Sequence, residues 1–126
     1  MAEIENNAYF WQKVDTLFLS SDFTINKKKG EVHDTYSNLI YPVDYGKIQI
    51  NEGGASIYLG SGNRYKASAL IIAADILAKE LDVKILAGCS EEEEEAVLHF
   101  LNQTDYQKTV LIRRGTELPS WAYTDN

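Results

Sequence analysis

The segment "YPVDYG", Tyr41–Gly46, places two tyrosines and a carboxylate around a proline and a glycine. Tyrosine hydroxyls donate hydrogen bonds to anions, and a carboxylate such as that of Asp44 can bind a metal or accept a proton. The same residue types are also common in turns that lead into a strand. The segment therefore predicts either one wall of a polar pocket or an ordinary turn that Asp44 holds in place.

Clusters of basic residues elsewhere in the chain could supply positive charge to such a pocket. Ammonium and guanidinium groups both recognise phosphates, and the arginine fork can do so with two parallel hydrogen bonds. Taken alone, each cluster is at least as well explained by a solvated turn or a charged edge strand. The clusters are Lys27–Lys29, Arg64 and Lys66 in the glycine-rich turn Gly60–Lys66, Lys84 beside Asp82, and Arg113 with Arg114.

Strand geometry limits which of these charges can act together. Neighbouring side chains of a strand point to opposite faces, so at most one of Arg113 and Arg114 can enter a pocket. Asp82 and Lys84 are two residues apart and share a face. There the carboxylate could hold a metal and the ammonium a phosphate, or the two could form an exposed ion pair.

Histidine and cysteine chemistry is disfavoured by the spacing of these residues. His33 lies in a polar loop and His99 at the edge of an acidic helix, and neither has a second histidine at metal-ligand spacing. Cys89 precedes a helix N-terminus, which could lower its pKa, but we expect a small packing residue. Glu91–Glu95 fan around that helix, so we expect a solvated helix start and no single metal cage.

Hydrophobic periodicity predicts two helices and several strands. An apolar stripe covers residues 7–19, and Ser90 with Glu93 forms a capping box at the start of a second helix. Residues 31–40 are expected to be loop, and the alanine-rich end of residues 67–81 could be strand or helix. The predicted strands are 22–25, 47–50, 55–59, 69–76, 83–89 and 109–114.

These elements predict a single α+β domain over residues 1–126, with residues 115–126 as an irregular tail. A helix would lie at the N-terminus, a small curled or barrel-like sheet in the middle, and a second helix before the last strand. A chain of 126 residues with 44% hydrophobic residues is large enough for one core.

Composition narrows the setting. No apolar run approaches the ~20 residues that cross a bilayer, the start "MAEIENNAYFWQK" has no signal-peptide pattern, and Cys89 is the single cysteine. We therefore expect a cytoplasmic protein without membrane contact. The net charge of −7 disfavours general nucleic-acid binding.

Beyond these observations, "YPVDYG" resembles the Tyr-Pro-x-x-Tyr-Gly segment of soluble type I inorganic pyrophosphatases. The order of elements from Phe10 to Arg114 is also similar to that of short, pyrophosphatase-like bacterial proteins. The resemblance implies an OB-like barrel with flanking helices, which agrees with the strand-rich pattern.

Residue by residue, the resemblance implies a pocket that keeps its phosphate ligands and lacks most of its metal ligands. Where the family has a D-x-D-x-x-D segment, this chain has Asn51, Gly53 and Ser56, with Glu52 among them, and Leu77 replaces a further aspartate. The residues that match the phosphate-binding positions are Tyr41, Tyr45, Lys29, Lys84, Tyr106 and Lys108, with Asp82 as the retained metal ligand.

Pyrophosphate hydrolysis in this family depends on several magnesium ions, and magnesium requires oxygen ligands that are mainly carboxylates. We therefore expect non-hydrolytic binding of a small phosphorylated ligand, either a diphosphate or a nucleotide-derived signal, without a required cofactor. Arg64 and one of Arg113 or Arg114 would add charge, and Tyr58 or Tyr65 could stack on a base. Sequestration of a nucleotide messenger by a phage or prophage anti-defence protein is one setting for such binding.

Two other functions stay open at this point. Asp44, Glu52 and Asp82 could form a rearranged site of a magnesium-dependent phosphohydrolase. The acidic helix and the aromatic tail could instead dock on a basic protein, and the chain could form a homo-oligomer.

Overall fold

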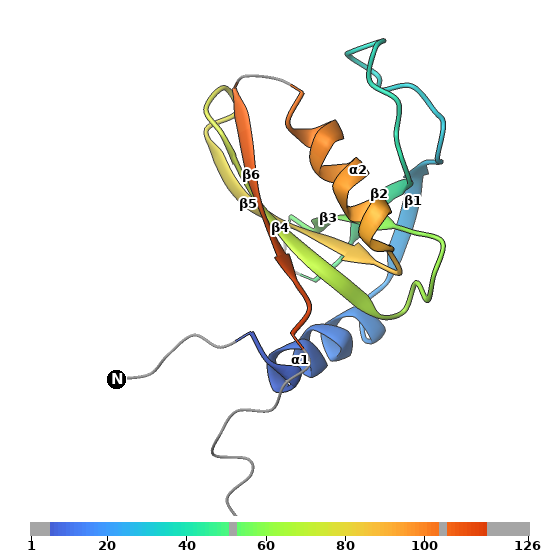
Figure 1. The fold of residues 1–126 in the computed structure, drawn as a ribbon, viewed down its shortest axis with the longest axis vertical. Helices are drawn as coiled ribbons and strands as arrows, with labels where there is room; N and C mark the ends of the chain where they lie inside the picture. Colours follow the sequence, from blue (N-terminus) through green and yellow to red (C-terminus); the bar gives the residue numbers. More distant parts are fainter. Residues whose placement is uncertain (1–5, 51–52, 104–105, 116–126) are drawn as a thin grey trace, which may run out of the picture.

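A computed structural model describes residues 6–50, 53–103 and 106–115 of the chain. In these residues two helices and six strands form an α+β fold (Figure 1). The elements are α1 (Ala8–Leu19), β1 (Phe23–Lys27), β2 (Asp44–Ile48), β3 (Ala55–Leu59), β4 (Ala67–Asp75), β5 (Glu80–Ala87), α2 (Glu91–Leu101) and β6 (Gln107–Arg113).

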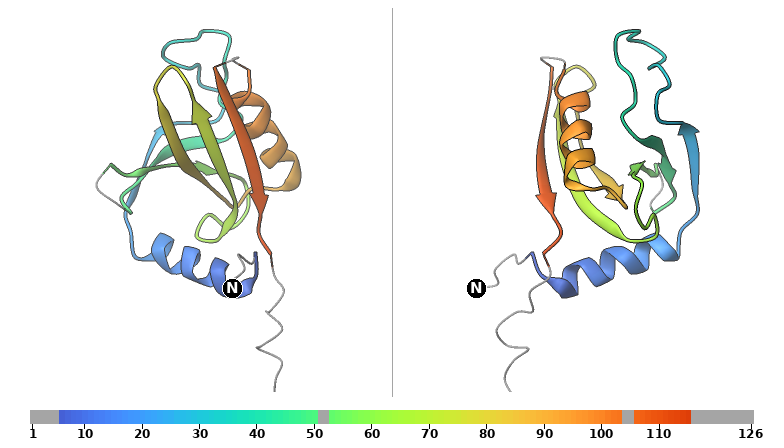
Figure 2. Two further views of the ribbon diagram at one scale, coloured as in Figure 1. Left: turned by 90° about the vertical axis from the view of Figure 1, so that its left-hand side faces the viewer. Right: turned by 45° about the vertical axis from the view of Figure 1, so that its right-hand side comes forward.

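The strands form one mixed sheet in the order β1-β2-β3-β5-β4-β6. β3 and β5 are parallel, and the other neighbouring strands are antiparallel. The sheet curls, as the right view of Figure 2 shows, but its edge strands β1 and β6 are not paired with each other. The predicted α+β fold with a curled sheet is confirmed, and the sheet is open where a barrel would be closed.

Helix α1 lies across one end of the sheet and covers part of one face (Figure 1). It begins at the N-cap Asn7, whose side-chain oxygen accepts hydrogen bonds from the backbone N–H groups of Tyr9 and Phe10. Its buried stripe is Trp11, Val14 and Phe18, at the spacing of one helical face. This stripe packs on Ile48, Ile57, Leu59, Ala67, Ile85 and Ala87.

Helix α2 packs on the opposite face of the sheet. The predicted capping box is confirmed: the Ser90 hydroxyl accepts from the Glu93 N–H, and the Glu93 carboxylate accepts from the Ser90 N–H. Val97, Phe100 and Leu101 form its buried stripe. The expectation that the whole glutamate run is solvated is wrong at Glu94, which is buried because it pairs with Arg113.

The alanine-rich end of residues 67–81, for which the sequence allowed strand or helix, forms the end of β4 and the turn to β5. Residues 76–79 form this turn, and the Asp75 carboxylate accepts hydrogen bonds from the N–H groups of Leu77 and Ala78. Pairing with two neighbours, β5 and β6, fixes the segment as strand. None of the described helices is long and apolar enough to span a membrane.

A long loop joins β1 to β2 and rises beside α2 (Figure 2). As predicted, residues 31–40 have little regular structure, although a single bridge pairs Val32 with Ile40. The predicted tail lies outside the described residues from position 116 onward, as do Asn51 and Glu52.

Candidate functional site

A cavity of about 260 Å³ lies between the β1–β2 loop, the C-terminal end of α2 and the sheet. We call it the aromatic cavity, because rings make up most of its wall. Of the predicted site residues it collects Tyr41, Tyr45, Lys84 and Tyr106. The other lining residues are His33, Tyr36, Leu39, Tyr58, Asp75, Phe100, Leu101 and Gln107.

Strand alternation brings the sheet residues of this cavity together. Tyr45 on β2 lies opposite Tyr58 on β3, and the two rings are 5.1 Å apart between centroids. On β5, Lys84 lies opposite Ser56, two residues before Tyr58 on the same face. One face of three neighbouring strands therefore presents two phenols and an ammonium group.

Stacked rings continue this wall into the loop. The Tyr41 and Tyr45 rings are 5.4 Å apart with planes at 26°, and the His33 and Tyr41 rings are 6.0 Å apart with planes at 13°. Phe100 of α2 packs 4.8 Å from Tyr41. Flat surfaces at such spacings suit a flat ring of a ligand, because offset stacking adds to apolar burial.

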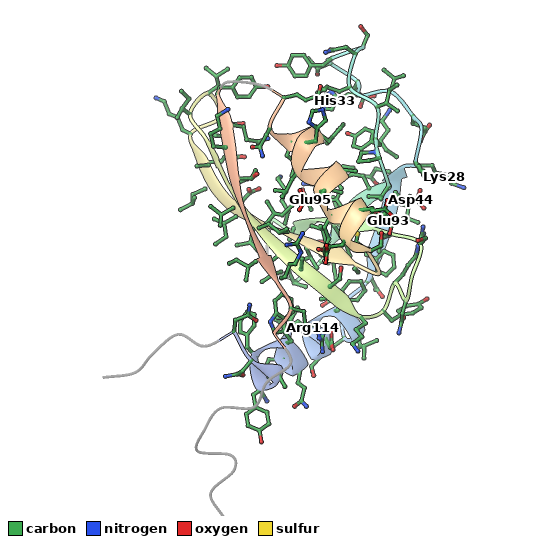
Figure 3. The ribbon with its side chains drawn as sticks, in the orientation of Figure 1. Lys28, His33, Asp44, Glu93, Glu95 and Arg114 are labelled. Carbon is green, nitrogen blue, oxygen red and sulfur yellow. The ribbon has the colours of Figure 1, made fainter. Side chains whose placement is uncertain are left out.

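The sequence predicts His33 to be a residue of a polar loop without metal chemistry. The structure instead places it in the wall of the aromatic cavity (Figure 3). Its Nδ1 accepts hydrogen bonds from the N–H groups of Thr35 and Tyr36, at 3.0 and 3.3 Å. In the neutral imidazole, Nε2 is then the protonated nitrogen and a donor. Periodicity cannot find such a residue, because the loop has no repeating pattern.

A row of polar groups crosses the sheet at the edge of the aromatic cavity. Ser56 is buried between Lys47 of β2 and Lys84 of β5, its partners in the strand register. Its Oγ lies 3.3 Å from the Tyr45 hydroxyl and accepts from Lys47 Nζ at 3.5 Å. We call Tyr45, Lys47, Ser56 and Lys84 together the lysine–serine row. Two ammonium groups and two hydroxyls thus lie at one place, and groups of this kind can bind an anion.

Asp82 shares this face with Lys84, as the spacing predicted. The Asp82 carboxylate lies 3.6 Å from Lys84 Nζ, and the Lys84 side chain is 12% exposed. Asp82 lines a neighbouring hollow together with Lys47 and Ser56. Of the two interpretations of Asp82 and Lys84, the contact in the structure is the ion pair.

Burial sets the protonation of the cavity tyrosines. It raises the pKa of Tyr41 above its usual value, with smaller contributions from Tyr45 and Asp34. Burial also raises the pKa of Tyr58 well above its usual value. Both hydroxyls therefore keep their protons at neutral pH and can donate hydrogen bonds.

Asp44 makes a separate cluster with two of the predicted basic residues. Its carboxylate accepts from the Lys29 backbone N–H at 2.8 Å and pairs with Arg64 Nη1 at 2.9 Å. Lys29, Asp44, Arg64 and Glu93 line a small cavity of about 70 Å³. Figure 3 labels two of them, Asp44 and Glu93. Asp44 precedes Tyr45 in β2 and so points to the other face. Lys29 and Arg64 therefore lie away from the aromatic cavity, and Asp44 holds the turn.

Neither terminal arginine lines the aromatic cavity. Arg113 pairs with Glu94 and Glu95 of α2, at 2.8 and 2.7 Å. Arg114 pairs with Asp15 of α1 and donates to the Ala67 carbonyl. Both arginines join elements of the fold, which explains their charge without a ligand.

Two further predicted ligands lie apart from the cavity. Lys108 is exposed and, by alternation from Gln107, lies on the opposite face of β6. Tyr65 is 62% exposed in the turn before β4. Tyr106 and Lys108, which both match phosphate-binding positions of the resembled family, therefore do not lie on one face. An even spacing keeps side chains together only when both residues belong to the strand, and Tyr106 precedes β6.

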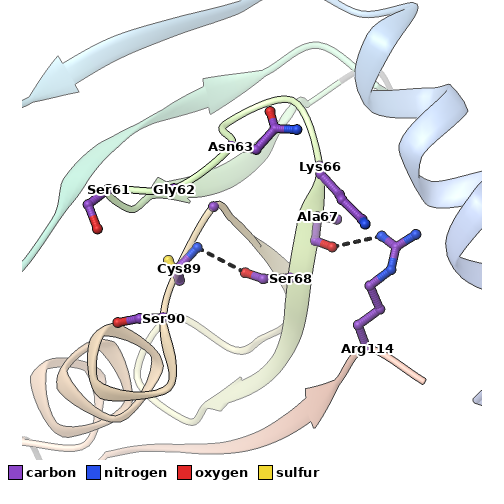
Figure 4. A pocket seen from close by; sticks show the side chains of 10 residues that line it. Ser61, Gly62, Asn63, Lys66, Ala67, Ser68, Cys89, Ser90 and Arg114 are labelled. Atoms are coloured by element: carbon purple, nitrogen blue, oxygen red, sulfur yellow. Dashed lines mark hydrogen bonds between the residues drawn. The ribbon is translucent and has the colours of Figure 1, made fainter. Parts of the chain in front are cut away.

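Another cavity, of about 390 Å³, lies beside the N-terminus of α2 (Figure 4). Ser68 donates to the Leu86 carbonyl and accepts from the Cys89 N–H, and Arg114 holds Asp15. Burial, together with Glu93 and Glu94, raises the pKa of Cys89 to about 12. The thiol is thus protonated, which contradicts a pKa lowered by the helix and supports the packing role.

Within the described ranges, no three His, Cys, Asp or Glu side chains form a group that could hold a metal ion. Of the three acids considered for a rearranged metal site, Asp44 and Asp82 line different cavities and Glu52 lies outside the described residues. The chain matches no protein-family model, no curated protein and no solved structure.

Proposed function

We propose that the chain binds a small phosphorylated ligand in the aromatic cavity without cleaving it. The observation that carries this proposal is the convergence of Tyr41, Tyr45 and Lys84, from a turn and two strands, on one cavity with Tyr106. The sequence pattern alone predicts these residues as phosphate ligands. The cavity volume of about 260 Å³ lies just below the range of typical small-molecule sites, so a nucleotide would fill it and extend over its edge.

The phosphate would lie over the lysine–serine row. Lys47 and Lys84 would supply charge, and the hydroxyls of Tyr45 and Ser56 would donate hydrogen bonds. The low exposure of Lys84 strengthens such an interaction, because a partly desolvated charge is screened less by water. The ligand would have to compete with Asp82 for the Lys84 ammonium group.

A flat ring of the ligand would stack on the wall formed by His33 and Tyr41. This favours a nucleotide-derived ligand over inorganic pyrophosphate, because pyrophosphate makes no use of stacked rings. Sequestration of such a signal is the role that we propose for the binding.

The proposal of binding without hydrolysis is supported by the partners of the nearby carboxylates. Asp75 accepts two backbone N–H groups in the hairpin turn, and Asp82 lies against Lys84. Ser56 belongs to the lysine–serine row at a position where the resembled family has an aspartate.

Calorimetric titration with pyrophosphate, ADP and a cyclic nucleotide tests this proposal. We expect binding of at least one nucleotide, weakened by about tenfold or more in Lys84→Met, because a charge-assisted contact contributes roughly 1.5–3 kcal/mol. Lys108→Met is the matched control, since Lys108 is exposed on the opposite face, and it should bind like the wild type.

Absence of binding to all three compounds would refute the proposal. A phosphate-release assay with magnesium, on the wild type and Asp82→Asn, separates binding from hydrolysis. Turnover that requires Asp82 would favour the phosphohydrolase alternative.

A further inference from the structure

The sheet face opposite the aromatic cavity carries apolar side chains that no helix covers. In the strand register, Ile72 of β4 lies between Val83 of β5 and Val110 of β6. The next row places Leu81 opposite Ala74. We call the set the outer patch, and it consists of Ile72, Ala74, Leu81, Val83 and Val110.

The outer patch is open to solvent. The exposed fractions are 76% for Leu81, 61% for Val110 and 45% for Val83. The adjoining row of Leu70, Ile85 and Ile112 belongs to the core under α1. Helix α1 therefore covers this face only up to the row next to the patch. The left view of Figure 2 shows the upper parts of β4, β5 and β6 with no helix over the face that carries the patch.

The outer patch is about as large as the largest apolar patch of a typical monomeric protein, and such patches often bind a partner. Its side chains expose on the order of 400 Å². A standard interface buries about 800 Å² per partner, and weaker specific interfaces bury about 600 Å². The patch supplies about two thirds of that smaller area, and the polar side chains around it, such as Lys108, would supply the rest.

The charges argue for an uncharged partner surface. Two rows of side chains form the patch, Val83–Ile72–Val110 and Leu81–Ala74–Lys108. Lys108 is charged and the other five side chains are apolar. The acidic residues of α2 lie on the other side of the sheet, where they pair with Arg113 or face solvent. Lys47 and Asp82 line a hollow at one edge of the patch, beside Leu81 and Val83, so these charges lie at its rim. A second outer patch matches the apolar rows in both size and polarity.

We propose that two copies of this chain pack outer patch against outer patch in a symmetric dimer. A twofold axis makes the contact self-complementary, and two sheet faces pack about 10 Å apart with their side chains interdigitated. The Lys108 stem can lie along the rim with its ammonium group in water. The aromatic cavity opens on the other face and stays accessible, so this proposal does not rest on ligand binding.

Light scattering coupled to size-exclusion chromatography tests the dimer. We expect twice the chain mass of 14.2 kDa for the full chain at micromolar concentration. Leu81→Lys should shift the protein to the monomer mass and raise the dimer dissociation constant by roughly a hundredfold. The twofold axis places the substitution in both copies, so each dimer would bury two added charges. Leu19→Lys is the control, since Leu19 is also exposed, at 65%, but lies on α1 outside the patch.

Val110→Lys provides a second variant in case Leu81→Lys does not fold, and circular dichroism checks the fold of each. A monomeric wild type would overturn the proposal, including the case in which another segment of the chain covers the patch. A dimer that survives both patch variants would also overturn it, because the contact would then lie on another face.

Discussion

The Tyr106 hydroxyl donates a hydrogen bond to the Tyr36 hydroxyl, with 2.8 Å between the two oxygens and a separation of 70 positions in the chain. Both side chains line the aromatic cavity, one from the β1–β2 loop and one from the start of β6. This contact ties the loop to the sheet at the side of the proposed binding site.

Loss of the hydroxyl contact should loosen the loop. In Tyr106→Phe we expect faster hydrogen exchange at the amides of His33 and Leu39, which bond within the loop. The reason is that local opening no longer breaks a link to the sheet. Tyr65→Phe, at an exposed tyrosine outside the cavity, should leave exchange unchanged. Equal exchange in both variants would show that the contact does not hold the loop.

Gly46, the last residue of "YPVDYG", is required by its neighbours. A Cβ at this position would overlap the backbone carbonyl of Thr24 on β1. Gly46→Ala should therefore reduce the free energy of unfolding by about 2 kcal/mol or more, as overpacking does. Urea unfolding measures this, with Gly53→Ala as control because no atom lies near a Cβ there. A Gly46→Ala protein as stable as the control would contradict the pairing of β1 with β2.

The Asp15–Arg114 pair should make stability depend on pH. Burial alone raises the pKa of Asp15, but the hydrogen bonds from Arg114 and the Ala67 N–H lower it below its usual value. A lowered folded-state pKa stabilises the protein above the unfolded-state pKa of about 4, and this contribution is lost as the pH falls through the folded-state pKa.

Asp15→Asn tests this dependence. It should destabilise the protein by about 1–2 kcal/mol at pH 7, because Arg114 loses a bidentate charged partner, and by less near pH 3. Urea unfolding at both pH values measures the difference, and Asp22→Asn, at an exposed position, is the control. A destabilisation that does not change with pH would argue against the ion pair as its cause.

Cys89 should react slowly with alkylating reagents. Because burial raises its pKa to about 12, the thiolate fraction at pH 8 is roughly a thousandfold below that of a free cysteine. Mass spectrometry after iodoacetamide treatment measures the rate, and the urea-unfolded protein serves as the reactive control. Similar rates in the folded and unfolded protein would show that the thiol is accessible and ionised.

Features that depend on neighbours in the chain could be predicted from the sequence. The capping box of Ser90 with Glu93 needs three residues, and the buried stripe of α1 needs one helical period, so both are confirmed. The shared face of Asp82 and Lys84 is equally local, because a spacing of two in a strand always keeps one face.

The composition of the cavity depended on pairing between distant strands. The register of β2, β3 and β5 brings Tyr45, Ser56 and Lys84 into contact, and no local pattern contains this register. For the same reason Lys29, Arg64 and Arg113 were assigned to a pocket that they do not line. The Lys29 backbone N–H and the Arg64 guanidinium group both bind the Asp44 carboxylate, and Arg113 pairs with Glu94.

For "YPVDYG", the sequence by itself determined the residue types of the proposed phosphate pocket and the turn that Asp44 holds. The tertiary structure decided which charges reach that pocket, because the sheet places Lys84 beside the tyrosines and the loop adds His33 and Tyr36. The physical reason is that a side chain's type is local, whereas its neighbours follow from long-range hydrogen bonding between strands and from burial.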